Sequence, residues 1–314
     1  MLNCRLALHA MATRFELVIE GDDSPRLRAA GEEALSEIAR LDAQLSIYRT
    51  DSEISDLNLG AHREPVKLDP RTFHLLRRAI ELSQLTGGAF DITVLPLLRC
   101  WGLAGSSGVP PPDEIERCLQ LVGADHLQFD DRVCTVQFKQ TGVQVDLGAI
   151  GKGYAVDRAC ALMRENGVQS ALLNGGLSSV AAMGSSSGHE GWRVGIQHPL
   201  APNRLLTSVI LMNETLSISA VHGKSFYAEG RRFGHVIDPR TGRPVENSLL
   251  AAVILPSATD GDALSTALLA LGPPGLALLK EKFPSVRALV AVENGGKLQV
   301  ETQGIEQEIS STLH

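Results

Sequence analysis

The sequence predicts an α+β fold with mixed or antiparallel sheets and packed helices, rather than a doubly wound parallel sheet. Strand-like segments occur as hairpins, and amphipathic helices are placed between the hairpins instead of alternating regularly with single strands. No internal repeat or long linker is present, and 44% hydrophobic against 21% charged residues is typical of a soluble globular protein. The 314 residues could form one large domain or two, and they can bury a substantial core.

The elements predicted before residue 140 follow from apolar periodicity and from turn residues at their ends. A helix beginning at Ser24-Pro25 places its apolar residues on one face. Ser52 and Ser55 are spaced for a local capping turn. The predicted elements are, in order, a strand at 5–20 interrupted at Met11-Ala12-Thr13, helices at 24–45, 70–86 and 112–121, a loop at 104–112, and hairpin strands at 126–129 and 133–138.

The stretch 143–176 combines a strand, a glycine turn, a helix and a second strand. A glycine turn that opens a helix leaves backbone N–H groups free, and with Lys152 beside them these groups suit a phosphate. The glycines could equally serve close packing of strand against helix, and their spacing is not that of a nucleoside-triphosphatase loop. The pattern comprises alternating Val143, Val145 and Leu147, then Gly148, Gly151 and Gly153, a helical pattern from Tyr154 to Gly167, and a strand at 170–173 before Asn174-Gly175-Gly176.

Strands are expected next at 192–196, 206–211, 215–218 and 249–255, and a helix is expected to begin at Asp262. Asp262 and Thr266 are four residues apart, so their oxygens would project from one face of this helix. A carboxylate and a hydroxyl at this spacing suit an oxygen-preferring cation such as Mg²⁺. An N-cap aspartate and a threonine bonded back to the helix would give the same pattern.

The formal net charge of −7 argues against a nucleic-acid backbone or an anionic membrane as the main partner. No apolar run reaches membrane-spanning length, and residues 1–20 lack the order of a signal peptide. Five widely spaced cysteines favour reduced, mostly buried thiols. We therefore expect a cytoplasmic protein.

Seven motifs occur in order over almost the whole chain. They are SIYRTDSEISDLN, TGGAFDITVLPLLRCWG, VDLGAIGKGYAVDR, LLNGG, WRVGIQHP, GHVIDPRTGRPV and DALSTALLALG. Together they resemble the ApbE-type FAD:protein FMN transferases. This resemblance implies a single domain over residues 1–314 with an α+β, T-fold-related architecture. It also implies an Mg²⁺-dependent enzyme, with Mn²⁺ as an alternative ion, that splits FAD, attaches FMN through a phosphoester to a Thr or Ser hydroxyl of a target protein, and releases AMP.

The same resemblance implies roles for individual residues. His235 would be the catalytic base, since an imidazole with a pKa near ~6.5 can accept a hydroxyl proton. The metal ligands would be Asp262, Thr266 and the backbone carbonyl of Ala149. FAD would contact Lys152, Asp146, Met11, Tyr48, the backbone of Ala89, Phe90 and Asp91, and Ile237. On residue type alone, Tyr48 could instead be a packed ring, and Asp91 could cap the next segment.

The chain departs from the family pattern at three places. Ala12 replaces the glycine of Met-Gly-Thr, a mild change provided that φ stays negative there. The segment 218–222 reads Ile-Ser-Ala-Val-His where Thr-Ser-Gly-x-Tyr is expected, so Ala220 replaces a glycine and His222 a tyrosine. Leu177-Ser178-Ser179 follows the paired glycines where an acidic residue is common. The surroundings that would hold a target peptide are therefore altered, whereas the metal ligands and the base are retained.

Two other functions use the same residues. The protein could bind FAD without transferring FMN, or it could hydrolyse FAD to FMN and AMP with water in place of the target hydroxyl. The expected target carries the signature Asp-x-x-Ser/Thr-Gly-Ala/Ser-Ser/Thr, and a homodimer is compatible with the resemblance. Family members are often exported to the periplasm as lipoproteins, and this sequence does not show the signal for such export.

Overall fold

A computed structural model describes residues 2–103, 109–176, 178–221, 225–228, 231–246 and 248–305. Its main feature is an eight-stranded sheet in the order β1-β2-β6-β7-β10-β15-β16-β17, in which every neighbouring pair is antiparallel. The α+β prediction is therefore confirmed. The strands are β1 (Leu2–Ala10), β2 (Thr13–Gly21), β6 (Ser170–Gly175), β7 (Ser179–Met183), β10 (Thr215–Ala220), β15 (Ser248–Leu255), β16 (Arg287–Asn294) and β17 (Lys297–Gln303).

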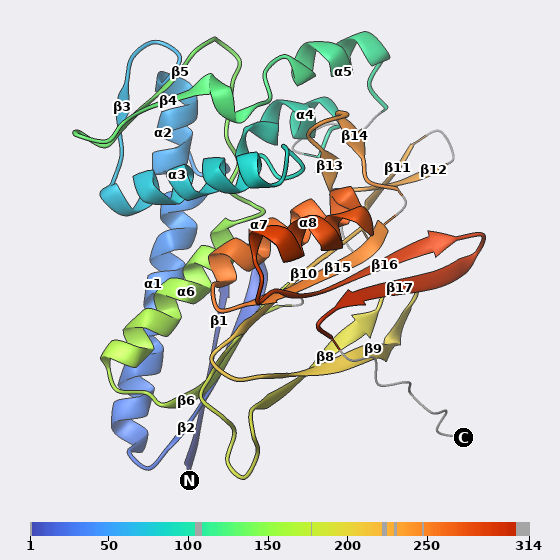
Figure 1. Cartoon of the computed structure of the whole chain (residues 1–314). Helices are drawn as coiled ribbons and strands as arrows, with labels where there is room; N and C mark the ends of the chain where they lie inside the picture. Colours follow the sequence, from blue (N-terminus) through green and yellow to red (C-terminus); the bar gives the residue numbers. More distant parts are fainter. Residues whose placement is uncertain are drawn as a thin grey trace.

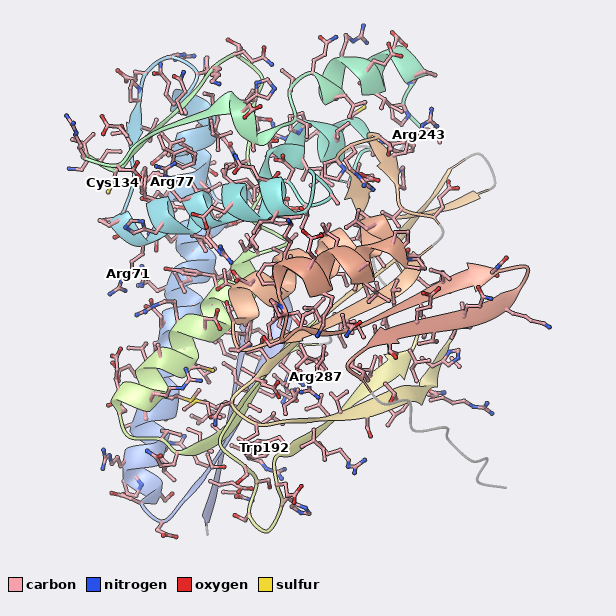
Figure 2. The ribbon with its side chains drawn as sticks, in the orientation of Figure 1. Arg71, Arg77, Cys134, Trp192, Arg243 and Arg287 are labelled. Atoms are coloured by element: carbon pink, nitrogen blue, oxygen red, sulfur yellow. The ribbon has the colours of Figure 1, made fainter. Side chains whose placement is uncertain are left out.

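The two faces of this sheet are covered by different elements (Figure 1). One face carries the main core, formed with α1 (Ser24–Leu45), α6 (Gly151–Glu165), α7 (Ala258–Leu271) and α8 (Pro274–Lys282). The other face packs against the hairpin of β8 (Trp192–His198) and β9 (Ala201–Leu211) in a second core. Trp192 donates from its indole nitrogen to Met183 O at 3.2 Å, and Arg287 donates to Ile210 O at 3.2 Å, which ties this hairpin to the sheet (Figure 2).

A second group of elements lies beyond the helical layer (Figure 1). Phe73 of this group belongs to the main core, whereas Leu97, Trp101 and Ile237 form a third cluster. The elements are α2 (Glu53–Gly60), α3 (Pro70–Leu85), α4 (Leu95–Cys100), α5 (Pro112–Leu119), a sheet of β3 (Val66–Lys67), β5 (Thr135–Phe138) and β4 (Leu127–Asp130), and the small hairpins β11 (Ser225–Ala228) with β12 (Arg231–Gly234) and β13 (Ile237–Asp238) with β14 (Arg243–Pro244).

The predicted strand at 143–147 is wrong, although its alternation is real. Val143, Val145 and Leu147 are all buried, but the segment pairs with no strand. The side chain of Asn58 accepts from Val145 N at 2.7 Å and donates to Val145 O at 2.9 Å. A side-chain amide thus satisfies the backbone groups that a neighbouring strand would otherwise pair.

Helix α1 spans Ser24–Leu45 as predicted, but Asp23, rather than Ser24, caps it through its carboxylate. Two other helices begin earlier than expected. The helix α6 already begins at Gly151. The helix α7 begins at Ala258 with Ser257 as its N-cap, so Asp262 lies inside the helix and is no N-cap. This last difference matters for the site, because the capping explanation of Asp262 no longer holds.

Other expectations can also be compared with the structure. Gly167 ends α6 with φ +79°, and Ser52 caps α2 by accepting from Ser55 N at 3.0 Å, as predicted. All five cysteines are free thiols, but only Cys4 and Cys160 are buried. Within the described ranges, no helix has the length and apolarity needed to cross a bilayer.

The condition under which Ala12 would be a mild replacement of glycine, a negative φ, is not met. Strands β1 and β2 pair up to Ala10 and Thr13, so Met11 and Ala12 form a two-residue turn. Their φ angles are 49° and 57°. A two-residue hairpin favours the type I′ turn, which requires positive φ at both positions because it matches the twist of the strands. Ala12 therefore carries strain that glycine would avoid.

We expect Ala12→Gly to stabilise the fold by about 1 kcal/mol, because glycine adopts positive φ without steric cost. Urea unfolding of the variant and the parent measures the difference. Ala220→Gly is the matched control, since Ala220 lies in β10 and is not among the described residues with positive φ. Glycine there should destabilise by roughly 0.5–1 kcal/mol. Equal effects of the two substitutions would contradict the strain at Ala12.

Candidate active site

The first turn of α6 meets α7 at a backbone contact. Gly153 N donates to Asp262 Oδ2 at 3.0 Å. A Cβ on Gly153 would lie 2.0 Å from Ala258 O and 2.8 Å from Asp262 Cβ, so only glycine fits. The predicted glycine turn therefore does serve close packing, but of helix against helix rather than of helix against strand.

This contact also satisfies an amide at the start of α6. Ile150 is the N-cap of the helix, so the first intrahelical bond runs from Tyr154 N to Ile150 O at 3.0 Å. The Gly153 amide, one of the first amides of the helix, has no acceptor within the helix and donates to Asp262 instead. Within the described part of the chain, no hydrogen bond to the carbonyl of Ala149, which precedes the N-cap, is recorded.

Asp262 is a charged group in an enclosed place. Its side chain belongs to a residue that is 3% exposed, and no arginine or lysine among the described residues pairs with it. A buried carboxylate without a countercharge is costly, so a bound cation would stabilise it. The chemistry of Asp262 and the free Ala149 carbonyl therefore fits a hard, oxygen-preferring metal ion.

Thr266, the third predicted ligand, follows one turn later on α7. Its hydroxyl oxygen lies 3.2 Å from Asp262 O, the acceptor expected for a threonine inside a helix. It also lies 3.0 Å from Ser219 Oγ of β10. The residue is half-buried, so its hydroxyl is not sealed within the core.

Two carboxylates fix the position of α7. Asp157 of α6 accepts from Ala258 N at 2.8 Å and Thr259 N at 2.9 Å, and also from the hydroxyls of Ser257 and Thr259. These bonds satisfy the free amides of the α7 N-terminus with a negative charge. Arg78 of α3 forms two bonds to Asp260, at 2.9 and 2.6 Å, and these bonds raise the pKa of Arg78 above its ordinary value.

Lys152 and Asp146 lie at the same end of α6. Lys152 Nζ donates to Gly148 O at 3.1 Å, and Asp146 Oδ1 accepts from Gly148 N at 2.7 Å. Asp146 N in turn donates to Ile92 O at 2.7 Å, next to Asp91. Asp91, Asp146 and Lys152 are therefore linked through Ile92 and Gly148, and Gly148 directly precedes Ala149 in the chain.

Asp91 has the capping role that was favoured on residue type alone. Its carboxylate accepts from Ser83 Oγ, Thr93 N and Thr93 Oγ1 at 3.0, 2.8 and 2.6 Å. The side chain is buried and fully used by these bonds. Only the backbone of this segment is left to contact a ligand, which is what the family resemblance implied.

His235 lies in a loop that is anchored to α7. Asp238 of the following strand β13 accepts two bonds from the Arg240 guanidinium, at 2.9 and 2.8 Å, which raise the pKa of Arg240. Arg240 also donates to Ala270 O at 3.2 Å, one turn beyond Thr266. His235 itself is half-buried and has an interaction of its own.

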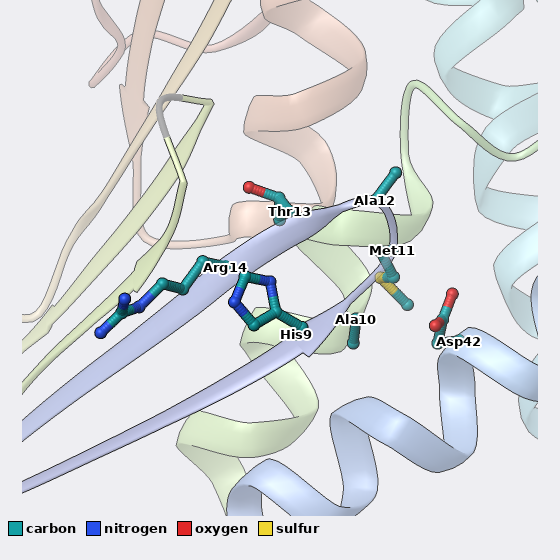
Figure 3. A pocket seen from close by; sticks show the side chains of 7 residues that line it. All are labelled: His9, Ala10, Met11, Ala12, Thr13, Arg14 and Asp42. Atoms are coloured by element: carbon teal, nitrogen blue, oxygen red, sulfur yellow. The ribbon is translucent and has the colours of Figure 1, made fainter.

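Met11 lines a hollow of about 510 Å³ at the β1–β2 turn, together with Asp42 of α1 (Figure 3). Asp42 is half-buried, and its carboxylate has no hydrogen bond or ion pair with the described residues. The turn reaches the end of β6, because a Cβ at Gly176 would be 2.1 Å from Thr13 Oγ1. This hollow lies at the strained turn described above.

Tyr48, Phe90 and Ile237 do not line this hollow. The Tyr48 side chain is 79% exposed, so it is not the packed ring that residue type favoured. Phe90 belongs to the main core and Ile237 to the cluster around Trp101. Their contacts with FAD, like the other ligand roles, stay predictions.

The sequence interpretation missed several residues of the site. The glycine pattern identifies Gly153 only as one of three turn glycines and does not show its contact with α7. Asp157 belongs to one of the seven motifs, but the sequence assigns it no role. Asp42 precedes the SIYRTDSEISDLN motif by four residues, and this proximity was the available signal. Ser219 was noted only as part of an altered segment. His222 and Leu177 of the altered segments lie outside the described residues.

Within the described ranges there is no cluster of three or more His, Cys, Asp or Glu side chains suited to a metal. A cation at Asp262 would therefore rely on the Thr266 hydroxyl, a backbone carbonyl and oxygens from a substrate. Mg²⁺ commonly binds in this way, through one or two carboxylates plus substrate phosphates.

We expect Gly153→Ala to destabilise the protein by about 1–3 kcal/mol, because the new methyl group would overlap the α7 backbone. Gly151→Ala is the matched control in the same helical turn, where a Cβ would meet its nearest neighbours at 3.8 and 3.9 Å. The control should be neutral or slightly stabilising, since alanine favours helix. Urea midpoints compare both variants with the parent. Equal midpoints for Gly153→Ala and the parent would show that the contact is not rigid.

Comparison with known proteins places the chain in a family. The ApbE family model matches residues 11–290. The chain is similar to the FAD:protein FMN transferase of Klebsiella pneumoniae, with 32% identity over 250 residues, covering 78% of this chain and 77% of that protein. It is 31% identical to the FAD:protein FMN transferase of Treponema pallidum over 287 residues, covering 84% and 77%.

Solved structures agree with the sequence comparison. The ApbE protein of Thermotoga maritima superposes with a TM-score of 0.86 at 29% identity, covering 95% of this chain and 96% of that one. The flavin transferase ApbE of Vibrio cholerae superposes with a TM-score of 0.83 at 25% identity, covering 96% and 97%. Since the family model spans most of the chain and both superpositions extend over nearly its whole length, the chain belongs to the ApbE family.

Proposed function

We propose that this protein is an FAD:protein FMN transferase, which moves FMN from FAD to a Thr or Ser hydroxyl of a target protein and releases AMP. The names of its relatives support the reaction class. The observation that carries the proposal for this chain is the Gly153–Asp262 bond, because it sets a carboxylate that pairs with no described arginine or lysine at the N-terminus of a helix. This arrangement suits a metal-bound diphosphate.

The chain's own residues would position and neutralise the diphosphate. Lys152 adds a positive charge at the α6 N-terminus, and its backbone amide has no recorded acceptor among the described residues. Both groups can bind phosphate oxygens. Asp262, Thr266 and the Ala149 carbonyl would hold Mg²⁺ or Mn²⁺, which when bound would act as a Lewis acid and offset charge on the diphosphate.

His235 would accept the proton of the target hydroxyl. As that proton leaves, the hydroxyl oxygen bonds to the phosphorus of the FMN half. The bond from this phosphorus to the bridging oxygen breaks, and AMP departs with the electron pair. Proton transfer to a positioned base of this kind contributes roughly 10²–10⁴-fold to a rate.

The altered segment 218–222 bears on whether transfer follows FAD binding. Ala220 is not among the described residues with positive φ, so this replacement of glycine strains nothing. The loss of the expected tyrosine at position 222 keeps two alternatives open, namely FAD binding without transfer and FAD hydrolysis. The target signature, a homodimer and a cytoplasmic location are further parts of the proposal, and they follow from the family resemblance and the sequence.

The function is tested by incubating the protein with FAD, Mg²⁺ and a peptide that carries the target signature. We expect covalent flavin fluorescence on the peptide and one AMP for each label, both measured after chromatography. Release of FMN and AMP without label would instead identify a pyrophosphatase, and intact bound FAD would identify a binding protein. Asp262→Asn is the matched control, because its amide oxygen can still accept from Gly153 N while the charge is lost. We expect this variant to stay folded and to lose transfer.

We expect His235→Ala to bind FAD as the parent does and to transfer FMN about 10²–10⁴-fold more slowly, as for removal of a general base. Flavin fluorescence titration gives the FAD affinity, and single-turnover labelling gives the rate. His198→Ala is the control, since His198 is also half-buried but lies in β8 on the opposite face of the sheet. An unchanged transfer rate in His235→Ala would remove this residue from the mechanism.

A further inference from the structure

Ser219 lies at the centre of a group of hydroxyls between β10 and α7. Its Oγ is 2.9 Å from Ser265 Oγ and 3.0 Å from Thr266 Oγ1. Ser265 and Thr266 both also reach the same backbone acceptor, Asp262 O, at 3.0 and 3.2 Å. Thr266 and Asp262 are two of the three candidate metal ligands, whereas Ser219 has no assigned role.

These four contacts cannot all be hydrogen bonds at once. Each of the three hydroxyls has one proton and can donate only one ordinary bond. If Ser265 and Thr266 both donate to Asp262 O, the single Ser219 proton can satisfy only one of its two contacts. The other contact then places two oxygens 3 Å apart with no proton between them, which is unfavourable for polar groups this enclosed.

Because three protons serve four contacts, every arrangement leaves one contact without a proton, and the least costly arrangement gives up the longest contact. Thr266 donates to Ser219, Ser219 donates to Ser265, and Ser265 donates to Asp262 O. The contact given up is the bond from Thr266 to Asp262 O, which at 3.2 Å is the longest of the four. In this chain of bonds Thr266 only donates, so both lone pairs of its oxygen stay available to a cation.

We propose that Ser219 is a positioning residue for the divalent cation: it accepts the Thr266 proton and so keeps the Thr266 oxygen free to bind the metal. The inference rests on the metal site of the proposed function. A cation on the Thr266 oxygen would make its proton a stronger donor, which would favour this direction of the chain. Partners of metal ligands that orient them in this way typically contribute 10- to 100-fold to metal affinity.

The neighbouring Ser217 gives the contrast that the structure provides. Ser217 and Ser219 are two residues apart in β10 and thus point to the same side of the sheet. Ser217 Oγ is fully buried near Gly261 of α7 and has no hydrogen-bond partner in the part of the chain that the structure describes, whereas Ser219 contacts two hydroxyls. If every serine beneath α7 supported the metal, replacing Ser217 would weaken metal binding as much as replacing Ser219. The proposal instead predicts an effect for Ser219 alone.

The test measures Mn²⁺ affinity in the presence of saturating FAD and without target peptide, by the electron paramagnetic resonance signal of free Mn²⁺. We expect Ser219→Ala to weaken Mn²⁺ binding about 10-fold or more. Ser217→Ala should leave it unchanged. FAD affinity without metal, followed by flavin fluorescence, should be the same in all three proteins, because Ser219 acts on the cation and not on the flavin.

A second pair of variants separates the hydroxyl from the packing. Ser219→Thr and Ser219→Val have nearly the same shape and equally suit a strand. We expect the threonine variant to bind Mn²⁺ close to the parent and the valine variant about 10-fold more weakly. Equal affinities in this pair, or an unchanged affinity in Ser219→Ala, would overturn the role of Ser219. A parent protein that binds no Mn²⁺ with FAD would instead overturn the metal site of the proposed function, on which the role depends.

Discussion

The contact between Gly153 and α7 is the constraint on which the rest of the site depends. Two helices that approach this closely leave no space for a Cβ, since one would lie 2.0 Å from a backbone oxygen. The approach lets the Gly153 amide, which has no acceptor within its own helix, reach the Asp262 carboxylate. A single glycine thus joins the N-terminus of one helix to a carboxylate of another.

The surrounding structure holds this contact in register from both sides. Asp157 joins α6 to the N-terminus of α7, and the Arg78–Asp260 pair joins α3 to the same turn. Beneath α7, the face of β10 carries Thr215, Ser217 and Ser219 instead of the apolar residues usual in a sheet core. A buried hydroxyl without a partner costs roughly 1–3 kcal/mol, and Ser217 and Ser179 are two such groups on paired positions of β10 and β7. Buried hydroxyls without partners lower the stability of the fold. Their presence beneath α7 therefore favours a functional role for this region.

The chemistry of the proposed site explains why substrate and cation would bind together. In the proposed site the protein would contribute one carboxylate, one hydroxyl and one carbonyl, which is too few ligands for Mg²⁺ without phosphate oxygens. The strained Met11–Ala12 turn borders a hollow in which the Asp42 carboxylate has no hydrogen bond or ion pair with the described residues. Local strain of this kind is often retained at binding sites, where the surrounding fold imposes it.

Much of the fold could be predicted from the sequence, because the information is local. Apolar spacing located α1 and α3, serine spacing located the cap at Ser52, and the glycine at position 167 ended α6. The ordered motifs also gave the family, and with it a set of site residues that includes Asp262, Thr266, Ala149 and Lys152. The alternation at 143–147 correctly predicted burial but not the partner, since a period of two does not distinguish a strand from an extended segment satisfied by Asn58.

What only the tertiary structure decided concerns contacts between residues far apart in the chain. The sequence determined which residue types are present and which face of each helix is apolar. It could not determine that Asp262 bonds to an amide 109 residues away rather than capping its own helix, because both outcomes need the same carboxylate. Nor could it show that Ala12 has positive φ or that Ser219 meets Thr266, since both facts arise from strand pairing and helix packing. Sequence patterns record local geometry, whereas the distances that define a site are set by how the layers pack.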